Sequence, residues 1–216
     1  MRICFINPNS TATMTDKIAA AARDVAGAAT RISAVTNTAG PPSIQGAADG
    51  DRAAPGVLAL VRDLEDTADA FVIGCFDDTG LAAARALTAK PVLGIGEAAM
   101  QMAGQGGRSF SVVTTLSASL PVLEANVAAY GLRGLCRRVR ASEVAVLELE
   151  EAGGAAEQRV AAEIARALAE DRPDAVVLGC AGMADLAARF TARFGLPVVD
   201  GVAAAVRLLE ERMAHC

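Results

Sequence analysis

The sequence predicts an α/β fold in which two pseudo-symmetric parallel-sheet α/β domains face one another across a cleft. Three observations support this prediction. Short β-branched runs alternate with Ala-rich stretches of helical period, the expected strands are apolar almost throughout, and the second half of the chain repeats the first. Near-continuous apolar strands are typical of sheets that are covered on both faces.

The strands and helices follow from this alternation. We expect strands at Arg2–Ile6, Arg31–Val35, Ala70–Ile73, Val92–Ile95, Ser109–Val113, Gly134–Val139, Ala175–Leu178 and Val198–Val199. We expect helices at Thr13–Ala26, Ala53–Glu65, Leu81–Ala89, Ser117–Tyr130, Ala155–Glu170, Ala184–Phe194 and Val202–Met213. The chain is expected to cross from one unit to the other near Gly96 to Gly107.

An internal repeat relates the two halves. Residues 69–75, Asp-Ala-Phe-Val-Ile-Gly-Cys, match residues 174–180, Asp-Ala-Val-Val-Leu-Gly-Cys, at an offset of 105. The next helices share Leu-Ala-Ala at that offset, and the following Pro-Val strands match at 106. The first strand aligns with residues 108–112 at an offset of 106, which makes Asn9 the counterpart of Thr115.

Two cysteines, Cys75 and Cys180, end equivalent strands of this repeat. Ligands of open α/β sheets bind outside the carboxyl ends of the strands, so we expect both thiols in one cleft. A helix that begins after each strand would lower the thiol pKa and supply N–H donors for an enolate oxygen. One thiolate could then remove a proton from a carbon acid while the opposite thiol returns one, with no cofactor and no metal.

Other interpretations are weaker. A lone cysteine often only packs, which is our interpretation of Cys4 and Cys136, while Cys216 and His215 lie at the chain end. The segment 94–99, Gly-Ile-Gly-Glu-Ala-Ala, fits a dinucleotide fingerprint, but no acidic residue ends a strand about 20 residues later. Asp77 and Asp78 follow Cys75, where a carboxylate could cap the next helix or contact substrate.

Composition excludes several classes of protein. A net charge of −5 argues against nucleic acid, and we interpret Arg137, Arg138 and Arg140 as a solvated face. No apolar stretch approaches the roughly 20 residues that span a bilayer, and the start lacks a signal-peptide pattern. We therefore expect a cytoplasmic protein with reduced cysteines, no membrane contact and a small-molecule substrate.

Several motifs together resemble the aspartate, glutamate and hydantoin racemase superfamily, and its hydantoin and allantoin racemase branch in particular. They are Ile-Asn-Pro-Asn-Ser at 6–10, Gly-Pro-Pro-Ser-Ile at 40–44 and the two cysteine motifs. The resemblance covers essentially the whole chain and implies that Cys75 and Cys180 are the catalytic acid and base. One departure is Gln45, where hydantoin racemases commonly carry Glu.

The resemblance also implies a set of substrate contacts. They are Asn9, Ser43, Ile44, Phe76, Asp77, Thr114, Thr115, Ala181 and Gly182. For Asn9 and Thr115, helix capping is an equally plausible role. Phe76-Asp77 and Ala181-Gly182 replace the Asn-Thr and Thr-His pairs of amino-acid racemases, so aspartate and glutamate are poor substrate candidates.

The family fold implies two domains, residues 1–96 with 201–216 and residues 97–200, in a homo-oligomer. The sequence thus favours racemisation of 5-substituted hydantoins or related ureides through an enolate. The alternatives are an allantoin racemase, a maleate-type cis-trans isomerase that uses one thiol as a nucleophile, or a non-catalytic ligand-binding module.

Overall fold

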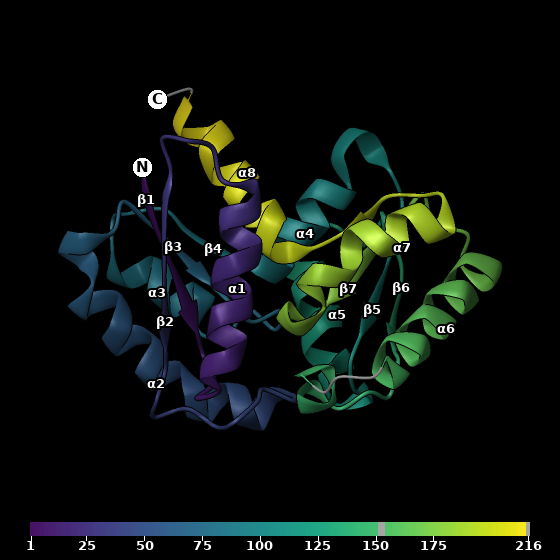
Figure 1. The fold of residues 1–216 in the computed structure, drawn as a ribbon, viewed down its shortest axis with the longest axis horizontal. Coiled ribbons are helices and arrows are strands. Elements are labelled where there is room, and N and C mark those ends of the chain that lie inside the picture. Colours follow the sequence, from purple (N-terminus) through teal and green to yellow (C-terminus); the bar gives the residue numbers. More distant parts are fainter. Residues whose placement is uncertain (151–153, 215–216) are drawn as a thin grey trace.

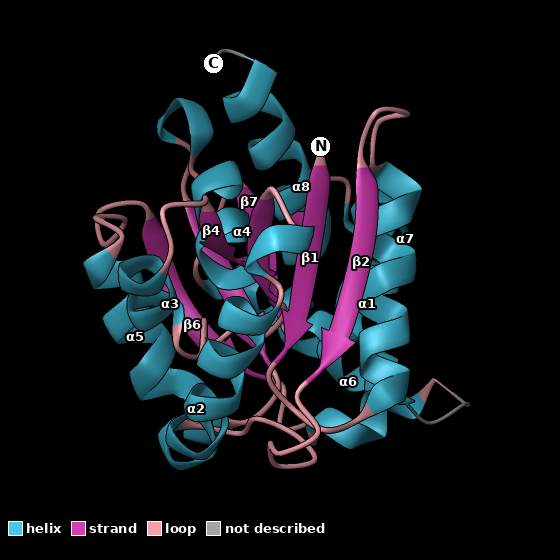
Figure 2. Cartoon of the chain, turned by 90° about the vertical axis from the view of Figure 1, so that its left-hand side faces the viewer, coloured by secondary structure: helices cyan, strands magenta, loops and turns pink. Residues whose placement is uncertain are grey.

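Two four-stranded parallel sheets form the framework of the molecule in the computed structural model, which describes residues 1–150 and 154–214. The first sheet has the order β2-β1-β3-β4 and the second the order β6-β5-β7-β8 (Figures 1 and 2). The strands are β1 (Arg2–Asn7), β2 (Arg31–Thr36), β3 (Ala70–Ile73), β4 (Val92–Gly94), β5 (Phe110–Thr114), β6 (Cys136–Ala141), β7 (Ala175–Gly179) and β8 (Val198–Val199). The strands follow the same order in both sheets, which confirms the predicted α/β fold of two related units.

Helices connect the strands and cover the sheets. They are α1 (Ala12–Val25), α2 (Ala47–Asp63), α3 (Leu81–Leu87), α4 (Ile95–Ala103), α5 (Leu120–Ala129), α6 (Ala155–Glu170), α7 (Ala187–Phe194) and α8 (Gly201–Ala214). Short 3-10 helices are η1 (Glu65–Thr67), η2 (Gln105–Gly107), η3 (Ser117–Ser119), η4 (Val146–Glu150) and η5 (Ala181–Leu186). All seven predicted helices are present, although those at 117–130 and 184–194 include 3-10 turns.

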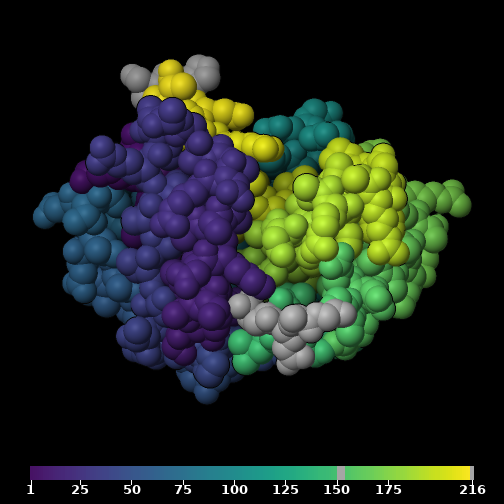
Figure 3. Space-filling view, in the orientation of Figure 1, coloured from purple at the N-terminus to yellow at the C-terminus, as the bar shows by residue number. Residues whose placement is uncertain are grey.

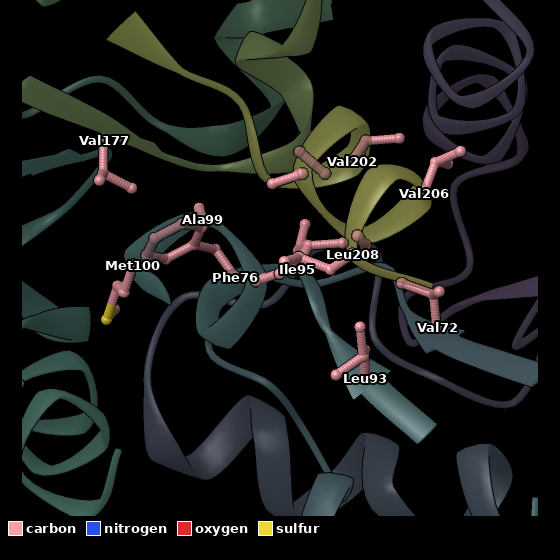
Figure 4. Close-up of a cluster of buried hydrophobic side chains, with 14 of the residues drawn as sticks. Val72, Phe76, Leu93, Ile95, Ala99, Met100, Val177, Val202, Val206 and Leu208 are labelled. Carbon is pink, nitrogen blue, oxygen red and sulfur yellow. The ribbon is translucent and has the colours of Figure 1, made fainter. Parts of the chain in front are cut away.

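Helix α4 was not predicted, because it has almost no polar face. Most of its residues are buried, and it lies where we expected only the crossing between units. Its side chains Ile95, Ala99 and Met100 belong to one core that also contains Val72 of β3 and Val177 of β7 (Figure 4). Helix α8 adds further side chains to this core, so the two halves share buried apolar surface. The predicted domain boundary falls inside α4, and the division into two domains stays a prediction.

The hydrogen-bonding registers of the strands correct the predicted alignment of β1 with β5. Ile3 lies beside Ala70, and Phe110 lies beside Ala175, which places the first strands of the two halves 107 residues apart rather than 106. Asn7 is therefore the counterpart of Thr114, and Asn9 is not the counterpart of Thr115. The one-residue error arose because Arg2 and Arg108 precede similar, mostly apolar runs, which align almost equally well at either offset.

Arg140 does not lie on a solvated face, as we had expected. It is 7% exposed and donates to Asp171 at 2.6 Å and to Glu163 at 3.1 Å. A buried guanidinium needs such partners, since an unpaired charge in the interior is costly. Arg137 and Arg138 are exposed, and Cys4 is a core residue as predicted. Among the described helices, none is both long and apolar enough to cross a membrane.

Candidate functional site

A narrow cavity lies between the two halves at the carboxyl ends of β3 and β7. Its walls are formed by Asn9, Met14, Ile44, Gly74, Cys75, Phe76, Asp77, Thr115, Ser119, Val146, Gly179, Cys180 and Ala181. The centre of a water molecule can occupy only about 20 Å³ of it, which is room for about one water. The walls must therefore move apart to admit a ring-shaped substrate.

Both cysteines reach this cavity through equivalent turns. The N–H of Asp78 donates to the carbonyl of Cys75 at 3.0 Å, and the N–H of Met183 donates to the carbonyl of Cys180 at 3.1 Å. The repeat offset of 105 relates these two hydrogen bonds. The thiols thus come from opposite halves onto one cavity, which is the arrangement that the sequence predicted.

The environment of Cys75 differs from the expected one. Burial raises the pKa of its thiol well above the ordinary value, and the carboxylate of Asp77 and the nearby Cys180 raise it further. We had expected a lowered pKa from an adjacent helix. Helix α3, however, begins only at Leu81, so its N-terminus lies too far along the chain to favour the thiolate. Cys180, by contrast, directly precedes η5 and is 8% exposed.

Polar groups occupy part of the cavity wall. The side-chain oxygen of Asn9 accepts from Asn7 Nδ2 and from the N–H of Thr11, both at 2.9 Å. Its amide nitrogen donates to the sulfur of Met14 at 3.4 Å, a weak bond that leaves donor capacity toward the cavity. Asn9 therefore lies fixed with its amide nitrogen available to a ligand carbonyl.

Asp77 places a carboxyl group beside Cys75. Its Oδ2 accepts from the hydroxyl of Ser119 at 3.3 Å. Burial raises the pKa of Asp77 to about 6, which the bonds from Ser119 and from the backbone of Gly46 only partly oppose. At neutral pH this carboxylate can accept a hydrogen bond from a ligand N–H group. Thr115 adds a hydroxyl group to the wall, and the other side chains, of Met14, Ile44, Phe76, Val146 and Ala181, are apolar.

Most of the predicted site residues line the cavity. Besides the two cysteines, these are Asn9, Ile44, Phe76, Asp77, Thr115 and Ala181. Three others lie behind or beside the wall. Ser43 accepts from Gln45 at 2.8 Å, the hydroxyl of Thr114 donates to the carbonyl of Gly179 at 2.8 Å, and Gly182 packs against Leu149. Their substrate contacts stay predictions, and none of the three is on the wall in this conformation.

Sequence reasoning missed Met14, Ser119 and Val146. Met14 and Ser119 fall within predicted helices, and Val146 lies in a segment with no predicted element, so no local motif marked them. Neither Asp77 nor Asp78 caps α3, whose first residue follows Gly80. In residues 1–150 and 154–214, no three His, Cys, Asp or Glu side chains are grouped to hold a metal. His215 and Cys216 lie outside the described residues.

Comparisons with known proteins agree with this architecture. A family model described as Asp/Glu/hydantoin racemase matches residues 3–209. The hydantoin racemase of Rhizobium meliloti is 48% identical over 211 residues, which cover 97% of this chain and 88% of that protein. The hydantoin racemase of Pseudomonas sp. (strain NS671) is 40% identical, with coverage of 97% and 85%. The structure of allantoin racemase from Klebsiella pneumoniae superimposes with a TM-score of 0.95 at 45% identity, covering 99% of this chain and 88% of that one.

Proposed function

This chain belongs to the Asp/Glu/hydantoin racemase family, and from that premise we propose that it racemises 5-substituted hydantoins or a related ureide such as allantoin. It is a racemase or isomerase, and its relatives named above act on hydantoins and on allantoin. The observation that carries the proposal is the convergence of Cys75 and Cys180 on one cavity from the equivalent strands of opposite halves. A planar ring between two such groups is accessible from both faces.

The proposed reaction is a proton transfer on each side of the ring. The thiolate of one cysteine takes the proton from C5, and the electron pair of the broken C–H bond moves onto the adjacent carbonyl oxygen to give an enolate. The thiol of the other cysteine then gives its proton to the opposite face of C5. The stereocentre is inverted, no atom is gained or lost, and the two sulfur atoms have exchanged their protonation states.

Two wall residues suit a ureide ring. The amide nitrogen of Asn9 can donate to a ring carbonyl, where the enolate charge develops, and such donors stabilise the transition state. The carboxylate of Asp77 can accept from a ring N–H group, whereas it would repel the carboxylate of an acidic amino acid. The polar part of the wall thus favours neutral rings with both N–H groups and carbonyls.

The test is an incubation of single enantiomers of hydantoins and of allantoin in deuterated buffer, with optical rotation and deuterium at C5 as readouts. We expect loss of rotation together with deuterium uptake. Cys75→Ala and Cys180→Ala should each lower racemisation by about 10² to 10⁴-fold, the usual contribution of a general acid or base. Cys136→Ala, which removes a thiol far from the cavity wall, is the matched control and should racemise normally.

Other outcomes would favour other functions. Unchanged rotation across the whole panel would remove the substrate proposal. A covalent adduct of one cysteine with an unsaturated diacid such as maleate would favour the cis-trans isomerase. Saturable binding of a panel member without turnover would favour the ligand-binding module.

We also propose that the enzyme works in the cytoplasm as a homo-oligomer. The proposed chemistry needs cysteines in the thiol form, and Cys4, Cys75, Cys136 and Cys180 form no disulfide in the structure. Homo-oligomers are common in the family that the sequence resembles. Light scattering of the purified protein should give a mass of two or more times 21.9 kDa. A mass of one chain at assay concentration would overturn the proposed homo-oligomer.

A further inference from the structure

The turn after Cys75 is held by donors from the other half of the molecule. The side-chain amide of Asn126 donates to the carbonyl of Asp77 at 3.0 Å, and the hydroxyl of Tyr130 donates to Oδ2 of Asp78 at 2.6 Å. Ser119, just before α5, donates to the carboxylate of Asp77. Asn126 and Tyr130 are four residues apart and lie on one face at the end of α5. Both therefore contact the segment that carries Cys75, and neither lines the cavity.

Asp78 also ties this turn to the start of α4. Its Oδ1 accepts from the N–H of Gly96 at 2.9 Å and its Oδ2 from the N–H of Glu97 at 2.7 Å. The residue is 6% exposed and has a φ of 53°, in the left-handed region that residues other than glycine rarely adopt. Such a conformation persists only where the surroundings fix it, as these donors do here.

The glycines of the segment 94–99 have a role in this contact. A Cβ at Gly94 would lie 1.9 Å from Oδ1 of Asp78, and one at Gly96 would lie 2.3 Å from the carbonyl of Phe76. The Gly-x-Gly pattern that resembled a dinucleotide fingerprint thus leaves room for the Asp78 carboxylate and the Cys75 turn. Asp78 thus connects the turn after Cys75 with the start of α4 and with Tyr130 at the end of α5.

The equivalent turn after Cys180 has none of these polar groups. The counterparts of Phe76, Asp77 and Asp78 are Ala181, Gly182 and Met183, and Met183 is fully buried in an apolar cluster. The hydrogen bonds from Asn126 and Tyr130 therefore hold the turn after Cys75, and the side chains after Cys180 offer no carboxylate for an equivalent of the Tyr130 bond.

We propose that Asn126 and Tyr130 are positioning residues for proton transfer at Cys75: by holding Asp77 and Asp78, they fix the thiol of the first half against the second half. This inference rests on the proposed function, since it assigns to these residues a role in the same reaction. A displacement of about 1 Å in a reacting group can lower the rate about 10²-fold. The polar contacts of α5 therefore make the Cys75 side of the cavity sensitive to residues that never touch the substrate.

The experiment compares Tyr130→Phe and Asn126→Leu with wild type by two readouts. The first is the alkylation rate of Cys75 and of Cys180 with iodoacetamide, followed for each peptide by mass spectrometry, which needs no substrate. Burial raises the pKa of the Cys75 thiol, so a loosened turn that lets water reach the thiol should lower that pKa. A fall of one pKa unit increases the thiolate fraction about tenfold. We expect faster alkylation of Cys75, by about 3- to 10-fold, and an unchanged rate at Cys180.

The second readout is deuterium uptake by each enantiomer, which should fall about 10- to 100-fold for the enantiomer whose proton Cys75 removes and much less for the other. Glu124→Gln, an exposed position on the same helix, is the matched control and should leave both readouts unchanged. Tyr130→Phe keeps the volume of the ring, so it should fold even if Asn126→Leu does not. Equal changes at both cysteines, or no change at either, would overturn the inference. If no panel member is turned over, the proposed function fails, but the ratio of the two alkylation rates still decides whether Asn126 and Tyr130 hold the turn of Cys75.

Discussion

The turn that carries Cys75 and the turn that carries Cys180 begin with the same hydrogen bond, but their backbones then differ, since Asp78 has a left-handed conformation and its counterpart Met183 lies in η5. Each closes with a hydrogen bond from the third following residue to the cysteine carbonyl. The first turn is fixed by partly buried hydrogen bonds to Asp77 and Asp78, and the second by the apolar packing of Met183. A duplicated framework can thus keep two thiols in equivalent places while their surroundings diverge, which suits a substrate whose two faces are not alike.

The largest expected effect tests whether the two thiols serve opposite faces. Cys75→Ala should still exchange the C5 proton of one enantiomer, and Cys180→Ala that of the other, since each variant keeps one base. In each variant, exchange of the remaining enantiomer should be about 10² to 10⁴-fold slower. Proton nuclear magnetic resonance of single enantiomers in deuterated buffer measures both rates. Loss of the same enantiomer in both variants would show that the two half-sites are not complementary.

The packing of the second turn gives the next largest effect. Met183→Ala should lower the free energy of unfolding by about 2 to 5 kcal/mol, the usual cost of truncating a fully buried side chain. Met183→Leu, which keeps most of the volume, should cost less than about 1.5 kcal/mol. Urea denaturation measures both values. A small loss in Met183→Ala would mean that apolar packing does not fix the Cys180 turn.

The glycines before the two cysteines offer a matched pair. A Cβ at Gly179 would lie 2.7 Å from Cβ and 2.8 Å from Cα of Thr114, so backbone would have to shift. A Cβ at Gly74 would meet the end of Ile18 at 3.1 Å and the carbonyl of Ile6 at 3.2 Å. We expect Gly179→Ala to cost about 1 to 3 kcal/mol and Gly74→Ala less, as measured by thermal unfolding. The reverse order would contradict the packing described here.

The last effect concerns pH, because only the first turn carries titratable side chains at these positions. Burial raises the pKa of Asp78 to about 7, while the donors from Tyr130, Gly96 and Glu97 oppose that rise. An unfolded aspartate titrates near pH 3.9, so the folded state binds this proton more tightly. The free energy of unfolding should therefore fall as pH rises from about 4 to about 7, where only the folded state still holds this proton, and this contribution should level off above pH 7.

Asp78→Asn, which cannot titrate, should flatten this slope in urea denaturation series at several pH values. The control change Asp51→Asn, at an exposed position of α2, should keep the wild-type slope. A slope that is the same in all three proteins would show that Asp78 does not titrate over this range.

The sequence predicted the strands well for a physical reason. Apolar β-branched runs bounded by turn residues are distinctive, and all eight strands lie where they were expected, within two or three residues. Helix α4 could not be predicted in the same way, because a helix buried on nearly all sides shows no polar period and its glycines resembled a loop. The offset between the first strands was wrong by one residue for a related reason, since uniform strands carry no register signal.

The site was predictable only in part. The repeat marked Cys75 and Cys180, because two equivalent strand ends share one duplicated motif. The raised pKa of Cys75 was not predictable, since it depends on burial and on where α3 begins. The contacts of Asn126 and Tyr130 join residues 49 and 52 positions apart in the chain, and no local pattern records such pairs.

The narrowness of the cavity bears on how the catalytic cycle is completed. After each inversion the two thiols have exchanged their protonation states, so the enzyme can bind and convert the product enantiomer but not the original one. The original protonation states must return before the enzyme can act on the first enantiomer again. That recovery needs a proton to pass between the sulfur atoms and bulk solvent, through a space with room for about one water.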